Sequence, residues 1–172
     1  MIESSVAIRY SFLGNYLSEG SDLKQPSELE DHVGYWLRYV SNHVSHAFAQ
    51  KVEAKGVTVA EWVLMRELLA SGTTNPSQLA EAVGQTRGAV SKLIERLTRK
   101  RLVVRLSSED DRRYQTVALT ASGKRLVPAL AQLADENDQE FFGHLKIKER
   151  LDLAKLLQEI VRRHGWKDLP VD

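Results

Sequence analysis

The sequence predicts a mostly α-helical fold with one small β-hairpin. Over most of the chain, apolar residues recur every three or four positions, which is the period of an amphipathic helix. Between residues 102 and 119 the period changes to two, which is typical of half-buried strands. With 172 residues, of which 42% are hydrophobic and 27% charged, the chain can bury a sizeable core. This composition excludes disorder as the main state.

Several protein classes are excluded by what the sequence lacks. The chain contains no cysteine, which excludes disulfide frameworks, thiolate zinc sites, iron–sulfur clusters and cysteine nucleophiles. No stretch is apolar enough to span a bilayer. The N-terminus lacks the basic cluster and apolar run of a secretory signal. We therefore expect a cytoplasmic protein that has no contact with a membrane.

The N-terminal part is predicted to lead into a long helix. Residues 1–27 form an extension, with a short helix expected within residues 6–17 and no functional interpretation. The run from Ser27 to Glu30 has the form of a capping box, in which a hydroxyl and a carboxylate cap each other's backbone amides. A helix is expected from about residue 28 to residue 54, ending at Gly56.

Three further helices are predicted from their capping residues. Thr58 and Glu61 form a second capping box, and the helix after it should stop near Gly72. Asn75 begins a short helix that ends at Gly84. The next helix follows residue 86 and runs to about residue 100. The first of these helices is expected to bury Trp62, Leu64, Met65, Leu68 and Leu69.

A hairpin and two helices complete the chain. Residues 102–106 and 115–119 read as strands around a polar tip, and Thr120 caps a helix to residue 142 that Pro128 should kink. A last helix is expected over residues 146–164. Two short helices joined at Gly84 form a helix-turn-helix, and a hairpin directly after it is a wing.

The helix after residue 86 has the features of a DNA-reading helix. Its apolar stripe must face the core and consists of Val90, Leu93, Ile94 and Leu97. Its first turn is small and polar, so that backbone amides can approach base edges or phosphates. Side chains here and at the start of the preceding helix are placed to touch bases or the DNA backbone. The candidate contacts are Ser77, Gln78, Thr86, Arg87, Gly88, Ala89, Ser91 and Lys92.

Charge is segregated along the chain. Residues 86–105 contain seven basic residues and one acid, a net +6, whereas the rest of the chain carries −5. Such segregation favours an anionic partner, although a charged helix face can also be merely solvated. The predicted hairpin tip adds Asp111, Arg112 and Arg113. An arginine on a wing can enter a narrow minor groove, and a nearby acid can hold the loop.

Residues 57–125 resemble the winged-helix core of the MarR family of transcriptional regulators. The matching residues are Val57, Thr58, Trp62, Leu64, Gln78, Leu79, Ala80, Val83, Gly84, Val90, Leu93, Ile94, Arg96, Leu97, Leu102, Val103, Arg105, Asp111, Arg112, Arg113, Val117, Leu119, Thr120 and Gly123. The resemblance implies a homodimer whose terminal helices intertwine and whose two lobes grip operator DNA. It also implies that Arg113 is the minor-groove arginine, that Asp111 is its partner, and that residues 86–92 contact the major groove. Arg101 departs from the family, which usually has glycine there. This departure leaves undecided whether the helix ends in a left-handed residue.

The resemblance divides the chain into an extension (1–27), a dimerisation helix (28–56), a winged-helix lobe (57–120) and C-terminal dimerisation helices (121–172). Independently, the first and last helices offer more apolar surface than a small lobe can cover, which also favours a homodimer.

The long first helix carries a second candidate site. A stripe about 60° wide combines aromatic rings and imidazoles, which suits an aromatic or weakly acidic ligand. The candidate effector-binding residues are His32, Trp36, Tyr39 and His43, with Trp62 and Arg66 closing the other side. The same stripe could instead pack against a second copy of the chain. The histidine spacing lacks a thiolate or carboxylate in register, so no metal or other cofactor is predicted.

Together these features predict a dimeric DNA-binding regulator, a repressor that a small aromatic or phenolic ligand releases. The alternative is a winged-helix module for protein contacts without DNA binding, which the fold alone does not exclude. An enzyme is not expected, because the sequence has no phosphate-binding glycine loop, no nucleophile–base set and no convincing metal-ligand spacing.

Overall fold

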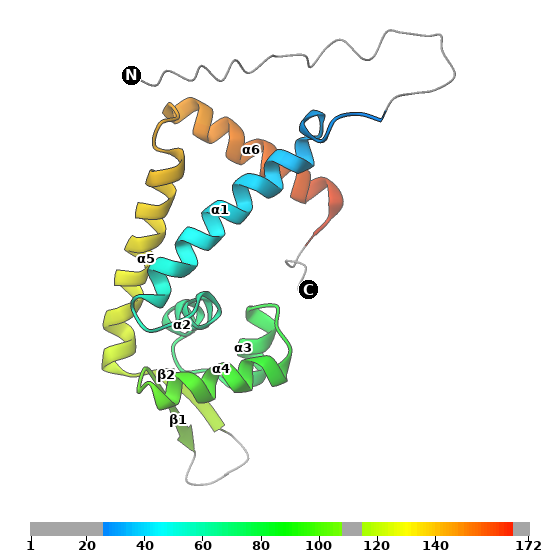
Figure 1. Cartoon of the computed structure of the whole chain (residues 1–172). Coiled ribbons are helices and arrows are strands. Elements are labelled where there is room, and N and C mark those ends of the chain that lie inside the picture. Colours follow the sequence, from blue (N-terminus) through cyan, green and yellow to red (C-terminus); the bar gives the residue numbers. More distant parts are fainter. Residues whose placement is uncertain (1–25, 108–114, 167–172) are drawn as a thin grey trace, which may run out of the picture. The chain divides into compact units, whose positions relative to one another are not determined.

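The computed structural model describes residues 26–107 and 115–166 (Figure 1). The elements in order are the 3₁₀ turn η1 (Leu29–Asp31), α1 (Val33–Glu53), α2 (Val59–Ser71), α3 (Pro76–Ala82), α4 (Arg87–Arg99), β1 (Val103–Ser107), β2 (Gln115–Leu119), α5 (Ala121–Phe142) and α6 (Ile147–His164). The predicted fold class, mostly helical with one hairpin, is confirmed. The helix expected within residues 6–17 lies outside the described residues. The chain divides into two units, residues 1–43 and residues 44–172.

The beginning of the first helix differs from the prediction. Residues Leu29–Asp31 form a 3₁₀ turn, His32 is extended, and α1 begins only at Val33. The predicted capping box from Ser27 is therefore wrong. The Glu28 amide instead donates to Asp31 Oδ2 at 3.2 Å, and Ser27 Oγ lies 3.0 Å from His32 Nε2. These local side-chain bonds compete with helix formation and delay its start.

The caps predicted in the second unit are confirmed. The Glu61 amide donates to Thr58 Oγ1, and the Thr58 amide donates to the Glu61 carboxylate, so both halves of the capping box are present. The other caps accept from the amide three residues on, and they are the side chains of Asn75, Thr86 and Thr120. Helix α5 remains continuous through Pro128.

One core connects α2, α3, α4, the hairpin and the first half of α5. The predicted stripe of α4 is fully part of it, because Val90, Leu93, Ile94 and Leu97 are all buried. The burial predicted for Leu69 is wrong, since 45% of its surface is exposed. Leu69 lies one turn beyond Met65 on the side of α2 that borders a hollow described below.

The wing is anchored at its base by three backbone segments. Strands β1 and β2 pair antiparallel with Val103 opposite Leu119. On the other side of β2, Thr74 and Val117 exchange two backbone hydrogen bonds of 3.1 and 2.8 Å. The connection between α2 and α3 therefore acts as a third, one-residue strand, which ties the helix-turn-helix to the wing.

The turn from α4 into β1 has a left-handed residue that is not glycine. Arg101 has a φ of 58°. The Arg101 amide donates to the Thr98 carbonyl at 2.9 Å, and the Leu102 amide donates to the Leu97 carbonyl at 3.0 Å. This is the complete Schellman pattern, so the helix ends as it would with glycine. The arginine retains this geometry at a conformational cost.

We expect Arg101→Gly to stabilise the chain by about 0.5–1 kcal/mol, because glycine adopts a positive φ without a Cβ clash. Chemical denaturation of both proteins would measure the difference. The matched control is Arg99→Gly, in the last turn of the same helix, which should cost about 1 kcal/mol because glycine disfavours helix. If both substitutions destabilise the chain equally, Arg101 carries no backbone strain.

Candidate DNA-binding surface

A hollow of about 510 Å³ lies between α3 and the start of α4. It is lined by Asn75, Ser77, Gln78, Ala80, Glu81, Gln85, Thr86 and Arg87. Four residues predicted to contact DNA thus border the same hollow, and all four are exposed. The helix-turn-helix brings them together because α3 ends at Ala82 and α4 begins five residues later.

The start of α3 is held by a small hydrogen-bond network. The Gln78 amide donates to Asn75 Oδ1 at 2.9 Å, and Asn75 Nδ2 donates to Gln78 Oε1 at 2.7 Å. Thr74 Oγ1 adds a third bond to Gln78 Oε1. The side-chain oxygen of Gln78 is therefore occupied, while the N–H donors of its side-chain nitrogen Nε2 are left for an acceptor such as a phosphate oxygen.

The first turns of α4 present a bare, basic surface. Arg87, Ser91 and Lys92 are exposed, and Ala89 is half-buried. A Cβ added to Gly88 would meet no atom within 4 Å, so packing within the chain does not require a glycine there. The absence of a side chain at Gly88 leaves the helix backbone open to a partner, as the sequence predicts.

The positive charge of residues 86–105 is only partly available to a partner. Lys100 Nζ lies 2.7 Å from Glu61 Oε2, and Arg96 Nε lies 3.7 Å from Glu61 Oε1. Arg99 pairs with Glu95. Within residues 26–107 and 115–166, Arg87, Lys92 and Arg101 form no ion pair. Among the described residues of α4 and the turn after it, the cations without an ion pair therefore lie in the first half of the helix and at its C-terminal turn.

Glu61 is fully buried, although it is an acid. Burial by itself raises the pKa of Glu61. The hydrogen bonds from Lys100 and the Thr58 amide, together with the charges of Lys100 and Arg96, lower it by more than burial raises it, so the net pKa is below the ordinary value. Its carboxylate is thus ionised at neutral pH and joins the first turn of α2 to the last turn of α4.

The predicted tip residues Asp111, Arg112 and Arg113 lie outside the described residues. The strands that carry the tip are described, and near its end Arg105 Nη1 donates to Gln115 Oε1 at 3.2 Å. The roles of the three tip residues remain predictions.

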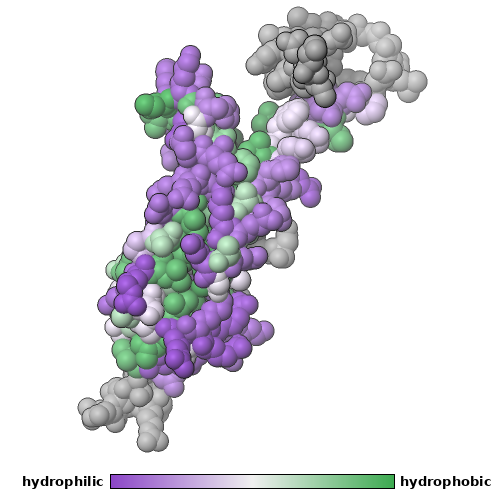
Figure 2. All heavy atoms as spheres, turned by 60° about the vertical axis from the view of Figure 1, so that its left-hand side comes forward, coloured by the Kyte–Doolittle hydropathy of each residue, from purple (hydrophilic) through white to green (hydrophobic). Residues whose placement is uncertain are grey.

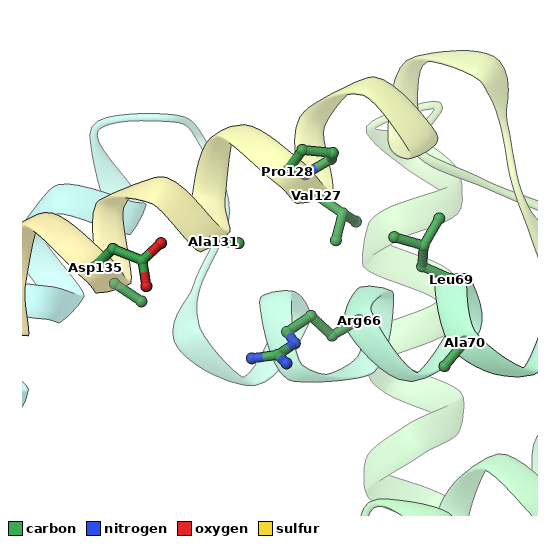
Figure 3. Close-up of a pocket in the computed structure, with 8 residues that line it drawn as sticks. Arg66, Leu69, Ala70, Val127, Pro128, Ala131 and Asp135 are labelled. Carbon is green, nitrogen blue, oxygen red and sulfur yellow. The ribbon is translucent and has the colours of Figure 1, made fainter. Parts of the chain in front are cut away.

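A second hollow, of about 440 Å³, lies between α2 and α5. It is lined by Arg66, Leu69, Ala70, Val127, Pro128, Ala131, Ala134 and Asp135. Figure 3 shows Arg66 and Leu69 coming from α2, and Val127 and Asp135 from α5. Figure 2, which brings the α5 side of Figure 1 forward, shows an apolar area bordered by hydrophilic side chains. The hollow therefore combines apolar walls with one cation and one anion.

Trp62 of α2 does not line this hollow, but its ring contacts Arg66, which does. The guanidinium carbon of Arg66 is 5.4 Å from the centre of the Trp62 ring, and Phe48 packs edge-on against that ring at 5.0 Å. The indole Nε1 of Trp62 is buried without a hydrogen-bond partner among the described residues. An unsatisfied buried donor is costly, and a ligand or water that accepts from it would remove that cost.

The other predicted effector residues belong to the unit that ends at His43. Trp36 and Tyr39 are about half exposed, and Trp36 Nε1 donates to the Glu30 carbonyl at 2.8 Å. The ring of Tyr39 lies 4.8 Å from that of His43. Because His32, Trp36, Tyr39 and His43 lie in one unit and Trp62 and Arg66 in the other, a shared pocket remains a prediction.

The sequence profile of the MarR family matches residues 55–113, which span the helix-turn-helix and the first part of the wing. Over these residues the chain is similar to the MarR family of transcriptional regulators. It is 26% identical over 136 residues to the HTH-type transcriptional repressor NicR of Pseudomonas putida, a match that covers 79% of this chain and 86% of NicR.

Solved structures of MarR-like regulators share the fold. One of them is Bordetella bronchiseptica BpsR, whose DNA binding is regulated by 6-hydroxynicotinic acid. It matches with a TM-score of 0.65 and 27% identity, and the match covers 79% of this chain and 97% of BpsR. The S. aureus MepR–DNA complex has a TM-score of 0.65 and 27% identity and covers 77% of this chain and 98% of MepR.

Two features of the chain were not predicted from the sequence. One is the ion pair of Glu61 with Lys100, because Glu61 was interpreted only as part of a capping box. The signal was an i, i+4 pair of cations, Arg96 and Lys100, beside the buried stripe of α4. The other is the bridge between Thr74 and Val117, for which the local sequence gives no signal. Separately, no helix in the described part of the chain is both long and apolar enough to cross a membrane.

Proposed function

We propose that this chain is a MarR-family regulator, which binds operator DNA as a homodimer and represses transcription until a small aromatic or phenolic ligand releases it. The observation that carries the DNA-binding part is the exposed, basic first half of α4 beside the hollow that Ser77, Gln78, Thr86 and Arg87 share. The name of the relative NicR, a transcriptional repressor, supports repression as the direction of control.

In the DNA complex, Arg87, Gly88, Ala89, Ser91 and Lys92 enter the major groove. Thr86 contacts the same groove, and Ser77 and Gln78 hold the DNA backbone at its edge. Arg113, held by Asp111 and flanked by Arg112, reaches the minor groove. The division of labour follows from side-chain chemistry, since arginine and lysine match guanine acceptors or phosphates, whereas hydroxyls and amides suit phosphate oxygens.

We expect Arg87→Ala, Lys92→Ala and Arg113→Ala each to weaken DNA binding about tenfold or more, because each removes a contact worth about 1–3 kcal/mol. Fluorescence anisotropy with a duplex that the wild-type protein selects from a random-sequence pool would measure this, at several salt concentrations. Melting temperatures should change little.

The matched control is Lys148→Ala, an exposed lysine of α6 paired with Asp152, which should leave affinity unchanged. A large loss of stability in the Arg113 variant would instead make that arginine structural. If the wild-type protein binds no duplex even at low salt, where phosphate contacts are strongest, the result favours the alternative of a protein-interaction module.

Dimerisation is supported by apolar surface in both units. In the first unit, Leu29, Val33 and Leu37 are each about half exposed or more. In the second unit, Leu156 and Ile160 of α6 are exposed. Surfaces of this kind are unusual on a monomer, and two-fold pairing would cover them. Light scattering is expected to give twice the mass of one chain, and a monomer at all concentrations would contradict the proposal.

The ligand part of the proposal rests on the hollow between α2 and α5 and on the aromatic stripe of α1. Arg66 and the unsatisfied indole of Trp62 suit a flat ring with an acidic group, and His32, Trp36, Tyr39 and His43 would contribute from α1. The relative BpsR, whose DNA binding is regulated by 6-hydroxynicotinic acid, supports this class of ligand.

We expect aromatic carboxylates such as 6-hydroxynicotinate to raise the melting temperature and to lower the affinity for DNA. A ligand at one hundred times its dissociation constant stabilises a protein by about 2.7 kcal/mol. A thermal-shift screen would detect this, and Arg66→Met should abolish the response while leaving the fold intact. An unchanged response in Trp36→Ala would remove the α1 stripe from the pocket.

A further inference from the structure

We propose that Glu61 is a positioning residue for the DNA-reading helix α4, an inference that rests on the proposed function. Glu61 is on α2 and lies far from the candidate DNA contacts at the start of α4. It acts through Lys100 and Arg96, whose side chains it holds at the opposite end of that helix.

The contacts of Glu61 make it a fixed point. Its Oε2 atom accepts from the Thr58 amide at 2.8 Å and from Lys100 Nζ at 2.7 Å. The two donors come from the cap of α2 and the C-terminal end of α4, and Glu61 and Lys100 are 39 residues apart in the chain. Because the carboxylate is buried and bonded to its own helix cap, it has little freedom to follow a moving partner.

The other carboxylate oxygen extends the contact to the preceding turn. Oε1 lies 3.7 Å from Arg96 Nε and is buried without a hydrogen bond among the described residues. Arg96 and Lys100 are one turn apart on α4, so the two contacts restrain both the rotation and the tilt of the helix. The apolar stripe permits small rolls, because apolar contacts are not directional.

The position of α4 matters for recognition because base-edge hydrogen bonds tolerate little displacement. A small rotation at the Lys100 end moves Arg87 and Lys92 at the other end of the same rigid helix.

Simple electrostatics predicts the opposite effect of removing Glu61. A carboxylate near DNA repels phosphates, so its neutralisation should strengthen binding. If Glu61 merely withheld Lys100 from the DNA, Glu61→Gln would also strengthen binding and steepen its salt dependence, because a further phosphate contact would form. A positioning role predicts weaker binding with an unchanged salt dependence.

The test compares four full-length proteins, namely wild type, Glu61→Gln, Lys100→Gln and the double variant. Affinity is measured at neutral pH for the duplex selected from the random pool, at a temperature where circular dichroism shows every variant folded. We expect each single variant to bind about tenfold more weakly, and the double variant to bind no more weakly than the weaker single one, since the pair is lost only once. The control Glu95→Gln removes the same charge from an exposed pair on α4 and should bind as well as wild type or better.

Equal or stronger binding by Glu61→Gln overturns the inference, and so do losses that add in the double variant. A fall in melting temperature without a change in affinity also overturns it and makes the pair purely structural. If the wild-type protein selects no duplex, the proposed function fails and the inference with it. If wild type binds and Glu61→Gln binds equally well, only the inference fails.

Discussion

The Gly123→Ala variant is expected to lose about 3 kcal/mol of folding stability, near the upper end of the usual cost of overpacking a core. A Cβ at this position would lie 2.2 Å from the Leu102 carbonyl oxygen and 3.1 Å from Leu119 Cδ2. The nearest obstacle is backbone, so no rotamer change relieves the clash. For a chain of this size the melting temperature should fall by about 10 °C.

The neighbouring hydrogen bonds explain why the backbone cannot move away. The Thr120 amide donates to the Leu102 carbonyl at 3.0 Å, and the Thr120 hydroxyl donates to the Arg101 carbonyl at 2.8 Å. The same hydroxyl accepts from the Gly123 amide and caps α5. A displaced Leu102 would break this hydrogen-bond network, which joins the end of α4, the wing and α5.

The matched control is Gly88→Ala, measured without DNA. An added Cβ at Gly88 meets no atom within 4 Å, and alanine favours helix, so this variant should be as stable as wild type or more stable by up to about 1 kcal/mol. Thermal denaturation of the two variants decides the question. A Gly123→Ala protein that melts like wild type would show that the start of α5 can shift freely.

Local signals made most of this fold predictable from the sequence. The caps at Thr58, Asn75, Thr86 and Thr120 involve side chains and amides three residues apart, so the sequence contains both partners. The buried stripe of α4 follows from helical periodicity alone. The left-handed turn after α4 persists with Arg101, because the Schellman bonds of the helix end outweigh the preference for glycine.

The unpredicted features depend on residues that are distant in the sequence. Nothing near Leu69 shows that its side of α2 borders a hollow rather than the core, so its burial was wrongly expected. The predicted start of α1 is an exception with a local cause, because Ser27 and His32, five residues apart, contact each other in place of the expected cap. The pairing of Glu61 with Lys100 requires α2 and α4 to be packed first, and the sequence gives each helix but not their contact.

The stabilising effect of Glu61 is expected to depend on pH. At neutral pH, Glu61→Gln should cost about 2 kcal/mol, because it replaces charge-assisted hydrogen bonds by weaker neutral ones. Lys100, the Thr58 amide and Arg96 together outweigh burial and hold the pKa of Glu61 below its ordinary value of 4.5. The unfolded chain therefore binds a proton to this group at a higher pH than the folded chain.

The sign of the effect follows. The stabilisation by ionised Glu61 is complete above pH 4.5 and is lost as the pH falls through the lower folded-state pKa. The stability difference between wild type and Glu61→Gln should therefore shrink in acid, because the glutamine does not titrate. Urea denaturation of both proteins between pH 7 and about pH 3 would measure this difference. The other carboxylates contribute equally to both proteins, so their effects cancel in the difference.

Glu159→Gln is the matched control for this prediction. The hydrogen bonds from Arg163 and Arg162 lower the pKa of Glu159 as well, but its side chain is partly exposed, whereas that of Glu61 is fully buried. Because water screens exposed ion pairs, we expect this variant to show little difference from wild type at any pH. A Glu61→Gln difference that stays constant into acid would mean that packing, and not the charge of the buried carboxylate, holds α2 against α4.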